Sequence, residues 1–179
     1  MGQFDRDQSC GGAPISDKAL FRALLARQVA CCYIMGIGVQ ATNRRLMWHG
    51  MFLFLLGLAT GFVEQQFTNM RMGLAAHLEG VMNGTFLVAL GAIWSEVRLR
   101  PAAKATAFWT ALYSTYMNWL VTALAAVFGT AALSPITAAG HSGQPWQEGL
   151  VTAGFMSVGV VIILCSGLVL WGLRSKASQ

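Results

Sequence analysis

The stretch LAAHLEGVMNGTFLVALGAIW, residues 74–94, decides how the chain is interpreted. It is mostly apolar and about as long as a helix that crosses the hydrocarbon core of a bilayer, which takes about 20 residues. Within it lie His77, Glu79 and Asn83. Polar and ionisable side chains are costly inside a membrane and usually face a site or a partner. The stretch therefore predicts a membrane helix with a functional polar side.

Glycines recur along the same stretch, at Gly80, Gly84 and Gly91. At roughly 100° per residue, these three fall within a narrow stripe on a helix, with His77 at its edge. Small residues in a stripe allow another helix to approach closely. Two interpretations follow: an ordinary packing seam in which the histidine has no special role, or a contact with a neighbouring protomer beside a functional group.

The composition is that of an integral membrane protein. Of the 179 residues, 55% are hydrophobic and 11% are charged, and the mean hydropathy is +0.55. Long apolar runs in a chain of this composition predict membrane spans. We therefore expect an all-α, four-helix membrane bundle, with spans at residues 46–63, 74–94, 107–128 and 150–173.

The net charge of +5 does not indicate nucleic-acid binding, because basic residues gather at the ends of the predicted spans. They flank the start of the first span, the connection between the second and third, and the end of the fourth: Arg44, Arg45, Arg98, Arg100, Lys104, Arg174 and Lys176. Loops rich in Lys and Arg stay in the cytoplasm. Both termini are therefore predicted to be cytoplasmic.

Residues 1–43 differ from the rest of the chain. They begin with a polar, Gly-rich tail, and Ser16 can cap a following amphipathic helix that would lie on the membrane surface. A second interpretation is that the natural protein starts later, for example at Met35. In either case, residues 44–179 form the predicted four-helix membrane domain.

Aromatic and amide side chains mark the predicted third span. Trp109, Tyr113 and Tyr116 follow helical spacing and predict one aromatic face, and Asn118 adds a buried amide. The face is either packing with an interfacial tryptophan, or a wall of an aromatic substrate pocket formed by Tyr113, Tyr116 and Asn118. The loop 129–149 is the longest and is expected to cover one end of the bundle.

The predicted fourth span is interpreted as structural. Its glycines suit close helix packing: Gly154, Gly159 and Gly167. Cys165 is expected to lie in the core.

Two segments carry a resemblance to a known family: RRLMWHGMFLFLLGL at 44–58 and GLAAHLEGVMNGTFLVALG at 73–91. Over about residues 44–175 the chain resembles the hydroxylaminobenzene mutase family of four-helix membrane isomerases. That resemblance implies a small aromatic substrate: family members rearrange N-phenylhydroxylamine to 2-aminophenol in bacterial nitroarene degradation. It also implies the bacterial inner membrane as the location.

A more distant similarity links the chain to styrene oxide isomerase, through the pairs Ala76-His77 and Asn83-Gly84. This similarity implies a homotrimer in which His77 ligates haem b at a subunit interface. Ferric iron would then act as a Lewis acid, and Asn83 would lie on the substrate side. The chain departs from that family near Ala125, where the relative has an active-site tyrosine, which argues against styrene oxide as the substrate.

Helix geometry constrains how these residues can act together. Asn83 lies about 9 Å along the helix axis from His77 and roughly 120° around it. If both contact one haem, Asn83 must therefore come from a neighbouring protomer. Glu79 lies one turn before Asn83, so the two can form a polar pair. Without haem, Glu79 becomes the candidate proton donor.

Two other functions are consistent with the sequence. One is a haem-dependent epoxide isomerase of the styrene oxide isomerase type. The other is a haem membrane protein that is not an enzyme, because His49 and His77 lie at opposite depths in different predicted spans, as in di-haem electron carriers. That difference in depth excludes a metal shared by the two histidines of one chain.

Overall fold

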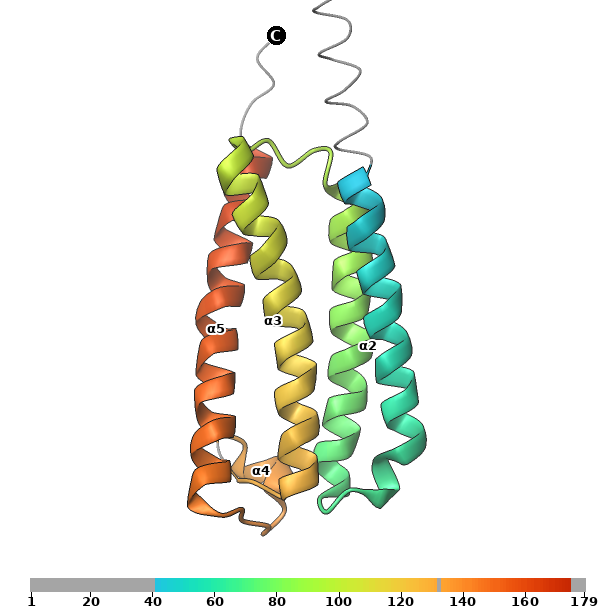
Figure 1. The fold of residues 1–179 in the computed structure, drawn as a ribbon, viewed down its shortest axis with the longest axis vertical. Coiled ribbons are helices and arrows are strands. Elements are labelled where there is room, and N and C mark those ends of the chain that lie inside the picture. Colours follow the sequence, from blue (N-terminus) through green and yellow to red (C-terminus); the bar gives the residue numbers. More distant parts are fainter. Residues whose placement is uncertain (1–40, 132, 175–179) are drawn as a thin grey trace, which may run out of the picture. The chain divides into compact units, whose positions relative to one another are not determined.

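The computed structural model describes residues 41–131 and 133–174. This part contains helices and no strands. Four helices are long and apolar enough to cross a membrane: Ala41–Gln66, α2 (Met70–Ile93), α3 (Pro101–Phe128) and α5 (Pro145–Arg174). They confirm the four predicted spans and the all-α class (Figure 1). Nearly all of the amphipathic helix predicted within residues 1–43 lies outside the described residues.

Local signals set where the helices begin and end. Asn69 caps α2, because its side chain accepts a hydrogen bond from Met72 N at 3.2 Å. Pro101 is the first residue of α3, where its missing N–H costs nothing. Gly129 ends α3 with φ of +66°, a left-handed conformation that favours glycine. A 3-10 turn, η1 (Glu64–Gln66), ends the first helix.

The bundle has two ends that differ in charge. The basic end holds the start of the first helix, the connection from α2 to α3 and the end of α5, with Arg44, Arg45, Arg98, Arg100, Lys104 and Arg174. There, Arg98 N donates to Gly172 O at 3.1 Å, which ties this connection to α5. The opposite end, called the loop end, holds residues 64–69, 129–131 and 133–145.

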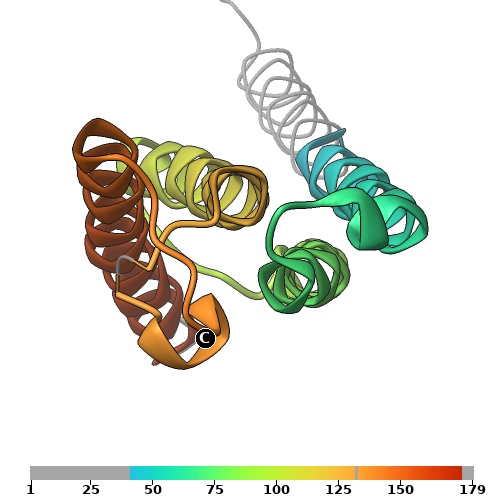
Figure 2. The same ribbon diagram turned by 90° about the horizontal axis from the view of Figure 1, so that it is seen from below.

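Helix α3 is the central helix. Viewed along the bundle, it lies between α2 and α5, and α2 lies beside the first helix (Figure 2). In its most apolar stretch 44% of residues are buried, against 33% in α2 and 11% in α5. The large apolar side chains that remain exposed along the spans suit contact with lipid.

The stripe of Gly80, Gly84 and Gly91 packs against the first helix of the same chain. A Cβ at Gly80 would lie 2.4 Å from Gly57 Cα, and one at Gly84 would lie 2.6 Å from Phe54 N. These distances allow no side chain, so the two backbones are in direct contact. The predicted use of this stripe by a neighbouring protomer is therefore wrong, because the first helix already occupies it.

The glycines of α5 behave differently from one another. Gly154 packs on α3, where an added Cβ would lie 2.6 Å from a methyl group of Val121. Gly159 and Gly167 have no atom within 4 Å of such a Cβ, so within this chain they make no close helix contact. The prediction for Cys165 is confirmed, since it is fully buried between α5 and α3.

The long loop covers the loop end, as expected. Its short helix α4 (Pro135–Ala138) packs against α2. The Asn69 side chain donates to Thr137 O at 2.9 Å and to Ala138 O at 3.1 Å, and the Asn69 N–H donates to Ala126 O at 3.1 Å. One buried asparagine thus joins the start of α2 to α3 and α4.

Candidate functional site

His77 lies on the side of α2 that faces the first helix. Its Nδ1 is 2.8 Å from Gly57 O. A carbonyl oxygen can only accept, so Nδ1 carries the proton and Nε2 of the neutral ring keeps its lone pair. Gly61 gives the ring its space, because a Cβ there would lie 2.7 Å from Nδ1. The first helix thus fixes a histidine whose second nitrogen can act as a base or ligand.

A hollow of about 330 Å³ adjoins His77. Its lining is apolar except for two ionisable side chains, and comprises Leu58, Gly61, Phe62, Glu64, Leu74 and His77. Several lining residues are themselves exposed, with Phe62 at 90% and Leu74 at 47%. We call this the His77 hollow. It combines an apolar surface with a nitrogen ligand, as small-molecule sites commonly do.

Glu79 and Asn83 form the predicted pair, but on the opposite side of α2, against α3. Asn83 Nδ2 donates to Glu79 Oε2 at 3.2 Å, and Asn118 Nδ2 of α3 donates to the same oxygen. Asn83 also reaches Thr115 O of α3 at 3.5 Å. Asn118 was predicted in an aromatic pocket, whereas the structure makes it a partner of Glu79.

Within one chain, His77 and Asn83 contact different helices. His77 bonds to the first helix, whereas Asn83 bonds to Glu79 and to α3. This agrees with the angle of roughly 120° expected between them. One chain therefore does not bring both residues to one hollow.

The aromatic residues of α3 also reach different partners. Tyr116 O–H donates to His49 O at 3.3 Å, and its oxygen lies 3.1 Å from His49 Nδ1 on the first helix. Tyr113 O–H lies 3.1 Å from Ser157 Oγ on α5. The predicted single aromatic face is therefore divided between two helices. None of Tyr113, Tyr116 and Asn118 lines the His77 hollow.

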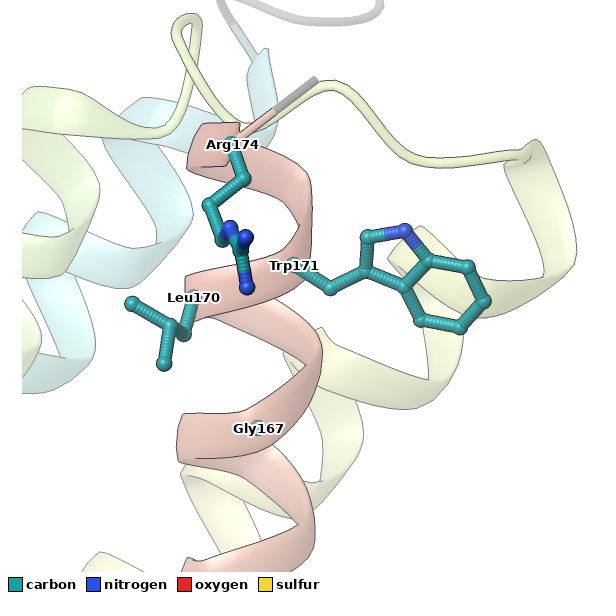
Figure 3. A pocket seen from close by; sticks show the side chains of 4 residues that line it. All are labelled: Gly167, Leu170, Trp171 and Arg174. Carbon is teal, nitrogen blue, oxygen red and sulfur yellow. The ribbon is translucent and has the colours of Figure 1, made fainter.

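A second hollow, of about 340 Å³, lies on α5 near the basic end. Gly167, Leu170, Trp171 and Arg174 line it, with the Arg174 guanidinium near Leu170 and the Trp171 indole on another side (Figure 3). It holds no acid or histidine. Its lining therefore gives no support for acid–base or ligand chemistry.

Within residues 41–131 and 133–174, no three His, Cys, Asp or Glu side chains lie together as a metal site. A cofactor that needs one nitrogen ligand from the chain fits the geometry of His77.

Comparison with known proteins agrees with this architecture. The family model for styrene oxide isomerase matches residues 42–174. The chain belongs to that family. Hydroxylaminobenzene mutase HabB of Ectopseudomonas oleovorans is 47% identical over 137 residues, covering 76% of this chain and 84% of the relative.

Hydroxylaminobenzene mutase HabA of the same organism is 44% identical over 104 residues, covering 58% of this chain and 77% of the relative. These relatives confirm the predicted family and the prediction that this family member is an isomerase. No solved structure gives a significant match.

The sequence predicted His77 but not its partners or its neighbour Glu64. The signal for the partners was Gly57 and Gly61, which are four residues apart in the first span. Such a pair marks close helix contact, as the stripe on α2 does. Glu64 gives no such signal, because it lies just beyond the predicted first span, which ends at residue 63.

Proposed function

We propose that this chain rearranges hydroxylaminobenzene or a close arylhydroxylamine to the corresponding 2-aminophenol. The two relatives named hydroxylaminobenzene mutase support this substrate class. The observation that carries the proposal is His77, held by Gly57 O with its second nitrogen available beside an apolar hollow. An aromatic ring suits such a lining, and the second ring nitrogen of His77 can act as a base or as a ligand.

The reaction moves a hydroxyl group from nitrogen to the ortho carbon without net oxidation. The N–O bond breaks, a C–O bond forms at the ring, and one proton passes from that carbon to nitrogen. Water that reached the ring cation would add at other positions. Leu58, Phe62 and Leu74 give the hollow apolar walls that suit the ring, and a second copy that covered them would keep water away from it.

We further propose haem b as the cofactor, with His77 as its ligand. The Nδ1–H bond to a backbone carbonyl is the usual outer-shell contact of a metal-bound histidine, since it fixes the ring and makes Nε2 the donor. When bound, ferric haem supplies a Lewis acid for the hydroxylamine oxygen. Within one chain Asn83 lies on the α3 side of α2, away from the His77 hollow. We therefore propose that the Asn83 that contacts the substrate comes from a neighbouring protomer.

The proposed setting is a homotrimer in a bacterial inner membrane with both termini in the cytoplasm. The basic end supports this orientation, because its arginines and lysine would face inward. The exposed apolar residues around the His77 hollow support an oligomer, since a second copy would cover them.

A second candidate function is epoxide isomerisation, which the match to the styrene oxide isomerase model favours. The same histidine and apolar hollow suit an epoxide that carries an aromatic ring. A parallel assay with styrene oxide separates the two candidates: release of phenylacetaldehyde would favour the second one.

The deciding experiment combines a spectrum with a product assay. Purified protein in detergent should show a Soret band and convert hydroxylaminobenzene to 2-aminophenol. His77→Ala should lose the band and lower activity at least about hundred-fold, whereas His141→Ala, an exposed histidine, serves as the matched control. Active protein without a Soret band would contradict the haem proposal and make Glu79 the candidate acid. Haem-loaded protein that forms no 2-aminophenol would contradict the proposed substrate.

A further inference from the structure

Glu64 shares the His77 hollow and lies in η1, the 3-10 turn that ends the first helix. Its backbone oxygen accepts from Phe67 N at 3.3 Å, which closes the turn. Gly73 of α2 lies against it, because a Cβ at Gly73 would be 3.2 Å from Glu64 Cβ. The turn and the start of α2 therefore hold this acid at the edge of the hollow.

One oxygen of the Glu64 carboxylate lacks a hydrogen-bond donor among the described residues. This oxygen, Oε2, is buried. The other half-buried acids differ: Glu79 accepts from Asn83 and Asn118, and Glu148 accepts from Ala131 N at 2.9 Å and Gly143 N at 2.8 Å. A buried oxygen without a donor is costly, so it marks a place where a donor is missing.

We propose that Glu64 is a substrate-binding residue of the His77 hollow, whose carboxylate accepts a hydrogen bond from the N–H or O–H group of the arylhydroxylamine. This inference rests on the proposed function for its substrate. Leu58, Phe62 and Leu74 contact the ring, and Glu64 is the acceptor that the hydroxylamine group needs.

Side-chain freedom allows this contact. The last torsion of glutamate has a broad energy minimum, so a modest rotation of the carboxylate can turn an oxygen toward a ligand at little cost. Hydrogen bonds to a charged acceptor are stronger than those between neutral groups. Glu64 would then distinguish aromatic ligands that carry a donor from ligands of similar shape that lack one.

The test is equilibrium binding of phenol and anisole to full-length protein in detergent, which requires no turnover. Phenol offers an O–H donor, whereas anisole carries a methyl group in its place. Wild-type protein should prefer phenol by roughly ten- to hundred-fold, the range expected for a hydrogen bond to a charged group. Glu64→Leu should abolish this preference and leave anisole binding unchanged, and Glu64→Gln should give an intermediate preference.

Glu96→Leu is the matched control, since Glu96 is exposed at the basic end, and it should keep the wild-type preference. Equal binding of the two ligands by wild-type protein would overturn the proposal, as would a Glu64→Leu protein that still prefers phenol or loses both ligands alike.

In turnover, Glu64→Gln should raise KM more than it lowers kcat. A wild-type protein that prefers phenol but forms no 2-aminophenol would contradict the proposed reaction. It would still support Glu64 as the hydrogen-bond acceptor of the hollow.

Discussion

Helices α2 and α5 are both long, apolar and rich in glycine, yet their glycines have opposite surroundings. On α2, a Cβ at Gly80 would lie 2.4 Å from the backbone of the first helix. On α5, a Cβ at Gly159 or Gly167 would meet nothing within 4 Å. One third of the most apolar stretch of α2 is buried, against 11% in α5.

The polar side chains of the candidate site lie on the closely packed helix. Helix α2 has neighbours on two sides, and each side holds a polar group: His77 toward the first helix and Glu79 with Asn83 toward α3. Helix α5 packs on α3 alone among the labelled helices, and its exposed side is apolar. The candidate site therefore lies where helices are closely packed, whereas α5 turns an apolar face outward.

The largest expected effect comes from filling the contact between the first helix and α2. Gly80→Leu should lower the free energy of unfolding by about 3 kcal/mol or more, because the backbones must separate to admit a side chain. Gly167→Leu, the matched change on α5, should alter it by less than about 0.5 kcal/mol. Denaturation in mixed detergent micelles measures both. Similar losses in the two variants would remove the distinction between these glycines.

The next effect concerns the polar network between α2 and α3. Asn118→Leu should lower the free energy of unfolding by about 1–2 kcal/mol, because Glu79 loses one of its two amide donors. A double-mutant cycle with Glu79→Gln should give a coupling energy of about 1 kcal/mol. A coupling near zero would show that the two side chains do not stabilise this contact.

A smaller effect distinguishes two tyrosines of α3. Tyr116→Phe should cost about 1 kcal/mol, because His49 loses its side-chain partner in a half-buried contact. Tyr113→Phe removes only a bond to Ser157 on the exposed α5 side and should cost less than about 0.5 kcal/mol. The reverse order would place the stronger polar contact on the α5 side.

The smallest predicted effects come from two glycine-to-alanine changes, which should shift the free energy of unfolding in opposite directions. Gly159→Ala should raise the free energy of unfolding by about 0.5 kcal/mol, since alanine favours helix more than glycine and space is open there. Gly80→Ala should lower it, because the added methyl group meets the backbone of the first helix. Two changes of the same sign would contradict the contrast between α2 and α5.

The fold was predictable from the sequence because a bilayer imposes length and hydropathy on every span. The four spans follow from that rule, and the pair of Glu79 and Asn83 follows from helical spacing. The sequence did not predict which helices pack against one another. An apolar face suits lipid and protein equally well, so the glycine stripe predicted a close contact but not which helix would make it.

The site was predictable only in part for a related reason. His77 was conspicuous because an ionisable group in a span is rare. Tyr113 and Tyr116 were grouped by their spacing, but hydrogen bonds to Ser157 and His49 separate them. Glu64 gave no signal, because an acid just past a predicted span resembles any surface residue until the fold brings it beside His77.

The contacts of Asn69 have a consequence for biosynthesis. The first helix with α2, and α3 with α5, are two helical hairpins that leave the ribosome one after the other. The bonds from Asn69 to Ala126, Thr137 and Ala138 join residues of the earlier hairpin to residues of the later one. They can form only after α3 and α4 have followed the first hairpin. Asn69 therefore joins the two hairpins at a late stage of biosynthesis. Protection of its side-chain amide from hydrogen exchange would report when this contact forms.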